Sequence, residues 1–244
     1  MEQVFLHLAR MGLYADWLVL AVLVLRLLLK KAPKRVVCLL WALVAIRLLC
    51  PVQIQWRASL MPPKETVEQT VQALPEFYYG SGNTETEAEG ETAPAAVHDL
   101  VYVLSRVWIA GMAVMLSWAT LSTLRLRRRL RASIRTEENV WICDEIDTPF
   151  VLGLFAPKIY LPSGIEDTQR VYVLDHERAH IARGDHWWKL LGWLLLSVYW
   201  YHILLWLAYV LLCRDLELAC DELAVQDLDR TGRAAYSQAL LDCS

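Results

Sequence analysis

The stretch VYVLDHERAHIARGDH, residues 171 to 186, is the part of the chain from which the rest can be interpreted. It places His176, Glu177 and His180 in the spacing H-E-x-x-H. Residues four positions apart face the same side of a helix, so the two imidazoles can bind one zinc ion and leave a position open for water. Glu177 can reach that open side without binding the metal and act as a general base. The spacing predicts a hydrolytic metal centre, and the alternative is an ordinary polar helix face.

The sequence offers two residues as the third zinc ligand, and His186 is the first of them. It lies ten residues after His176, where metzincins place their third histidine. Metzincins need glycine at the seventh position after the first histidine, because the chain turns back to the metal there. Arg183 occupies that position and Gly184 follows one residue later, so His186 is the weaker candidate.

Glu217, in the stretch LCRDLELACDELA, is the stronger candidate for the third ligand. Glu217 and Asp221 are four residues apart and share one helix face. One carboxylate can therefore bind zinc while the other orients a ligating histidine. Composition alone would favour a solvated acidic helix face at the same place.

The composition indicates a membrane protein, since 56% of the 244 residues are hydrophobic and 11 are tryptophan. Apolar stretches at residues 13–29, 36–50 and 100–124 predict three transmembrane helices. Basic residues follow the first and third stretches, whereas the acidic segment 52–98 has the composition of a flexible tether. The positive-inside bias then predicts an external N-terminus and an external 52–98 loop, with the basic connectors in the cytoplasm. The basic run 125–135 is typical of a stop-transfer signal at lipid head groups, so we expect membrane lipid and no nucleic acid as its partner.

Four charged residues lie within these apolar stretches. Arg26 is near the inner end of the first one, and we expect it to extend along the helix towards the cytoplasmic surface. Asp16, Arg47 and Arg106 are near the outer ends, where either pairing across helices or independent solvation is expected.

The six cysteines are scattered and lack C-x-x-C pairs. This spacing favours buried thiols over a disulfide framework or a thiolate metal site. The cysteines therefore give no prediction of a binding site.

Residues 187–213 are apolar enough to cross a membrane once, but a single crossing would separate Glu217 from His176. The stretch also carries Tyr199, Trp200, Tyr201 and His202 at its middle, where a single span would bury them in lipid. A re-entrant or membrane-associated helical hairpin, turning near residues 201–202, satisfies both observations.

Short β-prone runs at 140–143, 149–154 and 158–161, separated by prolines, predict a small sheet that leads into the motif helix. A protease holds its substrate extended along an edge strand. The candidates for that strand are the run 158–161 and, in the preceding run, Phe150, Val151, Leu152, Gly153 and Leu154.

Three stretches taken together resemble a known family: PFVLGLFAPKIYLP, HERAHIARGDHWWK and RDLELACDELA, the last two separated by the hydrophobic hairpin. They are similar to membrane metallopeptidases of the BlaR/MecR type, gluzincin-like antirepressors that relay antibiotic detection in Gram-positive bacteria. The resemblance implies that His176, His180 and Glu217 bind zinc, that Glu177 is catalytic and that Asp221 supports a ligand. One departure is His202-Ile203 in the hairpin, where many relatives have Asn-Pro or His-Pro.

We therefore expect a mainly α membrane protein with a three-span region (residues 1–124) and a cytoplasmic α+β gluzincin-like zinc peptidase domain (residues 125–244). Members of the family that it resembles usually continue with another span and an external sensor domain, whereas this chain stops in a predicted helix, so we expect either a fragment or a relative without a sensor. The expected function is a one-zinc endopeptidase in the bacterial cell membrane that cleaves a cytoplasmic repressor or itself in beta-lactam-responsive signalling. A homodimer is left open. The alternatives are a quality-control protease of the HtpX type and a non-catalytic zinc-binding receptor scaffold.

Overall fold

The computed structural model describes residues 2–29, 32–50 and 95–243. Most of the predicted external loop, residues 51–94, lies outside the described residues. The described chain is mostly helical with one small mixed sheet. Its helices are α1 (Glu2–Leu28), α2 (Lys34–Leu49), α4 (Ala95–Arg129), the single 3₁₀ turn η1 (Leu130–Ala132), α5 (Asp167–Arg183), α6 (Asp185–Val198), α7 (Ile203–Ala224) and α8 (Arg230–Asp242).

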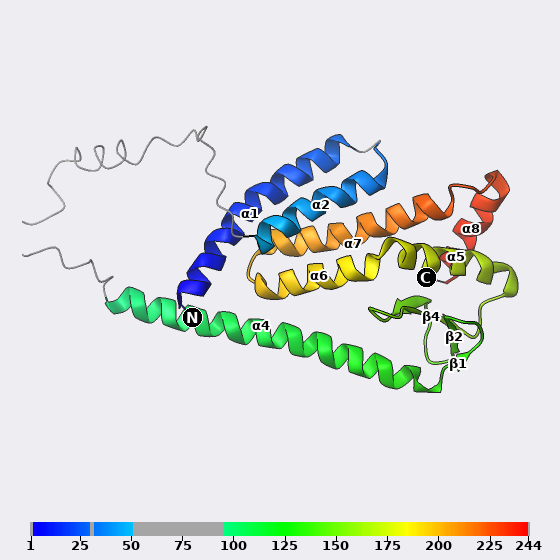
Figure 1. Ribbon diagram of the computed structural model, residues 1–244, viewed down its shortest axis with the longest axis horizontal. Helices are drawn as coiled ribbons and strands as arrows, with labels where there is room; N and C mark the ends of the chain where they lie inside the picture. Colours follow the sequence, from blue (N-terminus) through cyan, green and yellow to red (C-terminus); the bar gives the residue numbers. More distant parts are fainter. Residues whose placement is uncertain (1, 30–31, 51–94, 244) are drawn as a thin grey trace, which may run out of the picture.

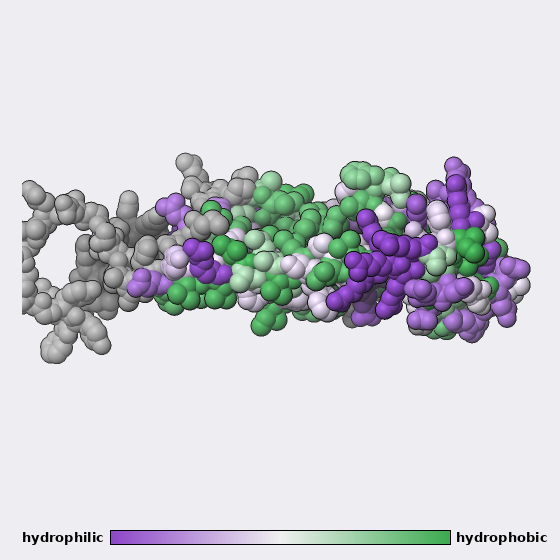
Figure 2. Space-filling model, turned by 90° about the horizontal axis from the view of Figure 1, so that it is seen from below, coloured by the Kyte–Doolittle hydropathy of each residue, from purple (hydrophilic) through white to green (hydrophobic). Residues whose placement is uncertain are grey.

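The molecule is elongated, with α1, α2, α4, α6 and α7 along its length and the sheet, α5 and α8 at one end (Figure 1). Within the described residues, two segments are long and apolar enough to cross a membrane, Gln3–Leu28 and Asp99–Ala132. In the most apolar part of the second segment, only 11% of the residues are buried inside the protein, so most of its side chains face outward. Figure 2 shows apolar residues along the middle of the molecule and hydrophilic residues gathered towards the sheet end. The predicted second span is α2, whose 16 residues are fewer than the roughly 20 of a full span, and three spans remain a prediction.

The sheet has four strands in the order β1-β2-β4-β3: β1 (Ile134–Arg135), β2 (Val140–Cys143), β3 (Phe150–Leu152) and β4 (Lys158–Pro162). β4 pairs parallel with β2 and antiparallel with β3, so β3 is an edge strand. The second substrate-strand candidate, residues 158–161, is β4, which is hydrogen-bonded on both sides. That candidate was wrong, because a central strand has no free edge for a substrate.

Side chains alternate across β4, which gives the sheet two packed faces. Ile159 and Leu161 pack with Val173 and Leu174 of α5, which fixes the motif helix on one face. Tyr160 packs with Leu130 and neighbouring residues on the other face. The sheet therefore serves as the platform on which α5 lies.

α6 and α7 form an antiparallel hairpin with its turn at residues 199–202, so both outer ends of the hairpin return to α5 (Figure 1). Two side chains of the turn donate hydrogen bonds to backbone carbonyls of neighbouring helices. Tyr199 Oη donates to the Leu48 carbonyl (3.3 Å), and Trp200 Nε1 donates to the Trp108 carbonyl (3.2 Å). The predicted turn is present, and its position in a membrane remains a prediction.

The charged residues of the apolar helices have specific partners. Arg26 forms a salt bridge with Asp215 of α7 (Nη2–Oδ1, 2.8 Å), with the side chains 21% and 2% exposed. The expectation that Arg26 extends to the cytoplasmic surface was therefore wrong, because a buried carboxylate on another helix satisfies it. Asp16 pairs across helices with His202 (Oδ2–Nδ1, 3.2 Å), whereas Arg106 donates to Tyr102 of its own helix (3.1 Å).

Candidate metal centre

α5 presents His176 and His180 on its buried side, each less than a tenth exposed. Their Nε2 atoms lie 3.2 Å apart, because the two residues are one helical turn apart and turn their rings towards each other. The helix ends at Gly184, whose φ of +70° lies in the left-handed region that glycine adopts without strain. This turn starts α6 directly after the motif.

Glu217 reaches the same point from α7. Its Oε2 atom lies 3.0 Å from Nε2 of His180 and 3.7 Å from Nε2 of His176. Ligand atoms bound tetrahedrally at about 2.0–2.1 Å from zinc are about 3.3 Å from one another. The three atoms therefore have the mutual spacing of three zinc ligands, and a fourth position is left for water.

The outer nitrogens of both rings are held by acceptors. Nδ1 of His180 lies 2.7 Å from Oδ2 of Asp185, whose side chain is 2% exposed. Nδ1 of His176 lies 2.8 Å from Oη of Tyr236, which itself donates to Oδ1 of Asp221 (2.8 Å). Since the Tyr236 proton is used on Asp221, Nδ1 of His176 is the donor in their contact. Both rings then keep the Nε2 lone pair for a metal.

Asp221 was predicted as the supporting carboxylate and lies 3.3 Å from Nδ1 of His176. Asp185 and Tyr236 were missed. Asp185 stands five residues after His180 in the R-G-D-H stretch. The glycine before it indicates the end of the motif helix, and this could have suggested that the next residue turns back towards His180. Tyr236 comes from α8, sixty residues after His176, and no local pattern indicates it.

The charges around the rings shift their pKa values in the metal-free protein. Burial alone would lower the pKa of His180, but its hydrogen bonds, led by the one to Asp185, outweigh burial and raise the pKa to about 11. Burial would raise the pKa of Glu217, but hydrogen bonds from both histidines and Lys189 lower it. A dication bound here would replace protons on the rings, so metal binding is coupled to proton release.

Glu177 is 6% exposed and belongs to a cavity of about 320 Å³. Burial raises the pKa of its carboxyl group above the ordinary value of 4.5. A raised pKa makes the carboxylate a better proton acceptor near neutral pH. The cavity is lined by residues of the motif, the edge strand and the residues before it, the hairpin, and the C-terminal part of the described chain, which are His176, Glu177, His180, Thr148, Pro149, Phe150, Val151, Asp185, His186, Lys189, Glu217, Leu240 and Cys243.

The family model described as BlaR1 peptidase M56 matches residues 6–244, which is nearly the whole chain. The chain belongs to the M56 peptidase family. The methicillin resistance mecR1 protein of Staphylococcus aureus is 21% identical over 169 residues, which are 60% of this chain and 29% of that protein. The regulatory protein BlaR1 of Bacillus licheniformis is 27% identical over 158 residues, 55% of this chain and 26% of that protein. The matched region thus spans less than a third of these M56 relatives.

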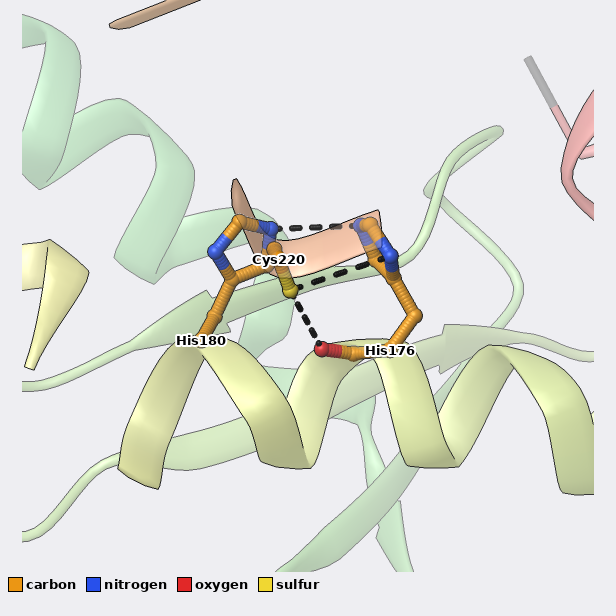
Figure 3. A group of neighbouring side chains, drawn as sticks. All are labelled: His176, His180 and Cys220. Carbon is orange, nitrogen blue, oxygen red and sulfur yellow. Dashed lines mark hydrogen bonds between the residues drawn. The ribbon is translucent and has the colours of Figure 1, made fainter. Parts of the chain in front are cut away.

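Cys220 gives this M56 chain a second set of metal-binding atoms. Donor atoms of His176, His180 and Cys220 all lie within 4.8 Å of one another, and Figure 3 shows the thiol beside both rings. The Sγ atom donates to the backbone carbonyl of His176 (3.3 Å) and lies 3.9 Å from Nδ1 of that ring. We favour Glu217 as the third ligand, because its oxygen faces the Nε2 atoms while the thiol is close to the nitrogen that Tyr236 holds. Cys220 is a buried thiol, as expected, and the expectation that the cysteines form no thiolate metal site stays a prediction.

His186 lines the cavity, but its Nε2 atom lies 3.2 Å from the carbonyl of Leu154, two residues after the end of the edge strand. This contact connects α6 with the β3–β4 turn. Lys189, a residue that the sequence did not single out, places Nζ 2.8 Å from Oε1 of Glu217. The Glu217 carboxylate thus has one oxygen on the histidine side and one on Lys189.

Proposed function

We propose that this chain is an integral-membrane zinc endopeptidase of the M56 family that acts in signal transduction. The observation that carries the proposal is the convergence of Nε2 of His176, Nε2 of His180 and Oε2 of Glu217 within 3.7 Å. Two nitrogens, one carboxylate oxygen and an open position form a catalytic zinc donor set. Zinc bound there would polarise the attacking water and the scissile carbonyl group.

Glu177 is the general base of the proposed reaction. It takes a proton from the attacking water and delivers it to the leaving amine. Asp185 and Tyr236 hold the two histidines in the tautomer that leaves Nε2 free, and the buried surroundings of Glu177 limit competing solvent. Glu177 thus transfers the proton, whereas Asp185 and Tyr236 orient the histidines.

A protein chain is the proposed substrate. β3 contributes Phe150 and Val151 to the cavity wall, and its outer edge is not paired within the described sheet. An extended peptide can add to that edge as a further strand and pass its scissile bond in front of Glu177. Gly153 and Leu154 follow the strand in the turn, where the φ of +119° at Gly153 suits glycine.

The membrane placement and the signalling role form part of the same proposal. The two apolar helices, together with α2, support a multi-pass protein with the metal centre on the cytoplasmic side. The names of the relatives, a methicillin resistance protein and a regulatory protein, support a signal that ends in cleavage of a cytoplasmic repressor or of the chain itself.

Metal analysis and cleavage assays on the purified full chain test the function. We expect about one zinc per wild-type chain, loss of zinc in Glu217→Ala, and full zinc without cleavage in Glu177→Gln. Zinc retention in Glu217→Ala would contradict the ligand set. Undiminished cleavage by Glu177→Gln would exclude the proposed base, and signalling by a cleavage-deficient Glu177→Gln protein would favour a zinc-binding scaffold.

A further inference from the structure

Asp215 of α7 is a buried acidic residue that the proposed chemistry does not use, and its side chain is 2% exposed. Arg26 of α1 donates to both of its oxygens, from Nε to Oδ2 and from Nη2 to Oδ1, each at 2.8 Å. Trp41 of α2 donates from Nε1 to Oδ2 at 2.9 Å. Three helices thus meet at one carboxylate. In the sequence, Asp215 is 189 residues from Arg26 and 174 residues from Trp41.

The position of Asp215 on α7 relates it to the metal centre. It precedes Glu217 by two residues, and two residues on an α-helix differ by about 200° in direction. Asp215 therefore faces α1 and α2 while Glu217 faces the histidines. Fixing Asp215 on one side of α7 sets the rotation and depth of the helix, and hence the direction of Glu217 on the other side.

α2 is also connected to His180, indirectly, through Arg183 and Asp185. Cys38 of α2 lies 3.8 Å from Nη2 of Arg183 and 3.6 Å from the Asp215 carbonyl oxygen. Arg183 donates from Nε to both oxygens of Asp185 at 3.2 Å, and Asp185 holds Nδ1 of His180 at 2.7 Å. α2 thus contacts Asp215 on the helix that carries Glu217, and it also contacts Arg183, the partner of the carboxylate that holds His180.

We propose that Asp215 is a positioning residue of the metal centre, held by Arg26 and Trp41 so that α7 presents Glu217 to the two histidines. A displacement of α1 or α2 against α7 then changes the metal affinity of the site, which links the apolar helices to the peptidase centre. This inference rests on the proposed metal centre. A protein–protein or lipid signal that moves α1 or α2 would act through the same carboxylate.

Cobalt(II) titration of the metal-free full chain in detergent, followed by its visible absorption, tests this role without measuring cleavage. The variant is Asp215→Asn, which keeps the size of the side chain and removes its charge. The matched control is Asp16→Asn, the same substitution at a carboxylate that joins α1 to the opposite end of the hairpin through His202. Trp41→Phe removes one hydrogen bond and keeps an aromatic ring, so it tests the same contact if Asp215→Asn yields no folded protein.

We expect Asp215→Asn to weaken cobalt binding about tenfold and to change the absorption of the bound ion, since supporting residues of metal ligands have effects of this size. Trp41→Phe should weaken binding by a smaller factor, and Asp16→Asn should bind like the wild type. Unchanged binding in Asp215→Asn and Trp41→Phe, or an equal loss in Asp16→Asn, would overturn the positioning role. Failure of the wild type to bind cobalt, or full binding by Glu217→Ala, would instead contradict the proposed metal centre.

Discussion

The phenolic oxygen of Tyr236 lies 2.8 Å from Nδ1 of His176, and the two residues are separated by sixty positions in the chain. Tyr236 also donates to Asp221 at 2.8 Å, so the carboxylate acts on the histidine through the phenol as well as directly. The last described helix therefore takes part in holding the first residue of the H-E-x-x-H motif.

Tyr236→Phe should weaken zinc binding about tenfold, because Nδ1 of His176 loses its nearest acceptor while the ring of residue 236 is kept. Competition with a metal chelator measures the affinity. Tyr160→Phe is the matched control, since Tyr160 is a buried tyrosine on the face of the sheet away from α5. Equal affinities of Tyr236→Phe and the wild type would show that Asp221 alone is sufficient.

Asp185→Asn should weaken zinc binding by about tenfold to a hundredfold. The neutral amide is a weaker acceptor for the His180 Nδ1 proton, and it also leaves Arg183 without its carboxylate partner. Asp175→Asn on α5, the helix of His180, is the control, because Asp175 is exposed and pairs with Arg178 at 3.8 Å. A similar loss in both variants would point to a general effect of charge near α5.

As the pH is lowered, cleavage activity should begin to fall at a higher pH than it would if the base were a glutamate with an ordinary pKa. Burial raises the pKa of Glu177, and the deprotonated form is the base, so activity is lost as the pH falls through this raised value. The measurement is kcat/KM against pH, with the zinc content determined at each point because the histidines also take up protons. An acid limb at or below 4.5, at constant zinc content, would contradict Glu177 as the base.

The two ends of the α6–α7 hairpin should be accessible from opposite sides of the membrane. Cys50 is exposed and follows α2, whose last turn contacts the hairpin turn through Leu48 and Tyr199. Phe155 in the β3–β4 turn is 91% exposed and meets the ring of Trp187, near the start of α6, edge to face. In intact cells, a membrane-impermeant thiol reagent should label Cys50, and in Phe155→Cys with Cys50→Ser it should react only after the cells are opened. Labelling of residue 155 in intact cells would show that the predicted orientation in the membrane is wrong.

Gly111→Ala should destabilise the protein, because a Cβ atom there would overlap the Trp200 ring of the hairpin turn. Overpacking of this kind costs about 1–3 kcal/mol. Thermal unfolding in detergent measures the change as a lower Tm. Gly164→Ala is the control, since a Cβ atom added there would meet nothing within 4 Å, and its Tm should stay near that of the wild type.

Local patterns predicted what depends on short separations in the chain. The spacing of four residues indicated that His176 and His180 share a helix face, and the structure places them so. Glu217 needed a topological argument, since it meets the histidines only if residues 187–213 turn back, and the structure brings the three side chains together. Their role as zinc ligands remains a prediction.

The contacts that were not predicted join residues far apart in sequence. Arg26 was placed at the surface because its position in an apolar helix is visible in the sequence, whereas its partner 189 residues later is not. Tyr236 and Trp41 were missed for the same reason, since an aromatic residue in a helix is typical of ordinary packing. Tertiary contacts, and not local propensity, decide what such residues do.

The place of Tyr236 in α8 has a consequence for how the centre matures during synthesis. A ribosome releases α5 and α7, with both histidines and Glu217, before α8 exists. Until α8 docks on α5, the ring of His176 has no phenol to fix its tautomer, and the cavity lacks the wall formed by Leu240 and Cys243. The newly made chain therefore passes through a stage in which His176 has Asp221 but not yet Tyr236 beside Nδ1, and the full support of the proposed metal centre arrives only with α8.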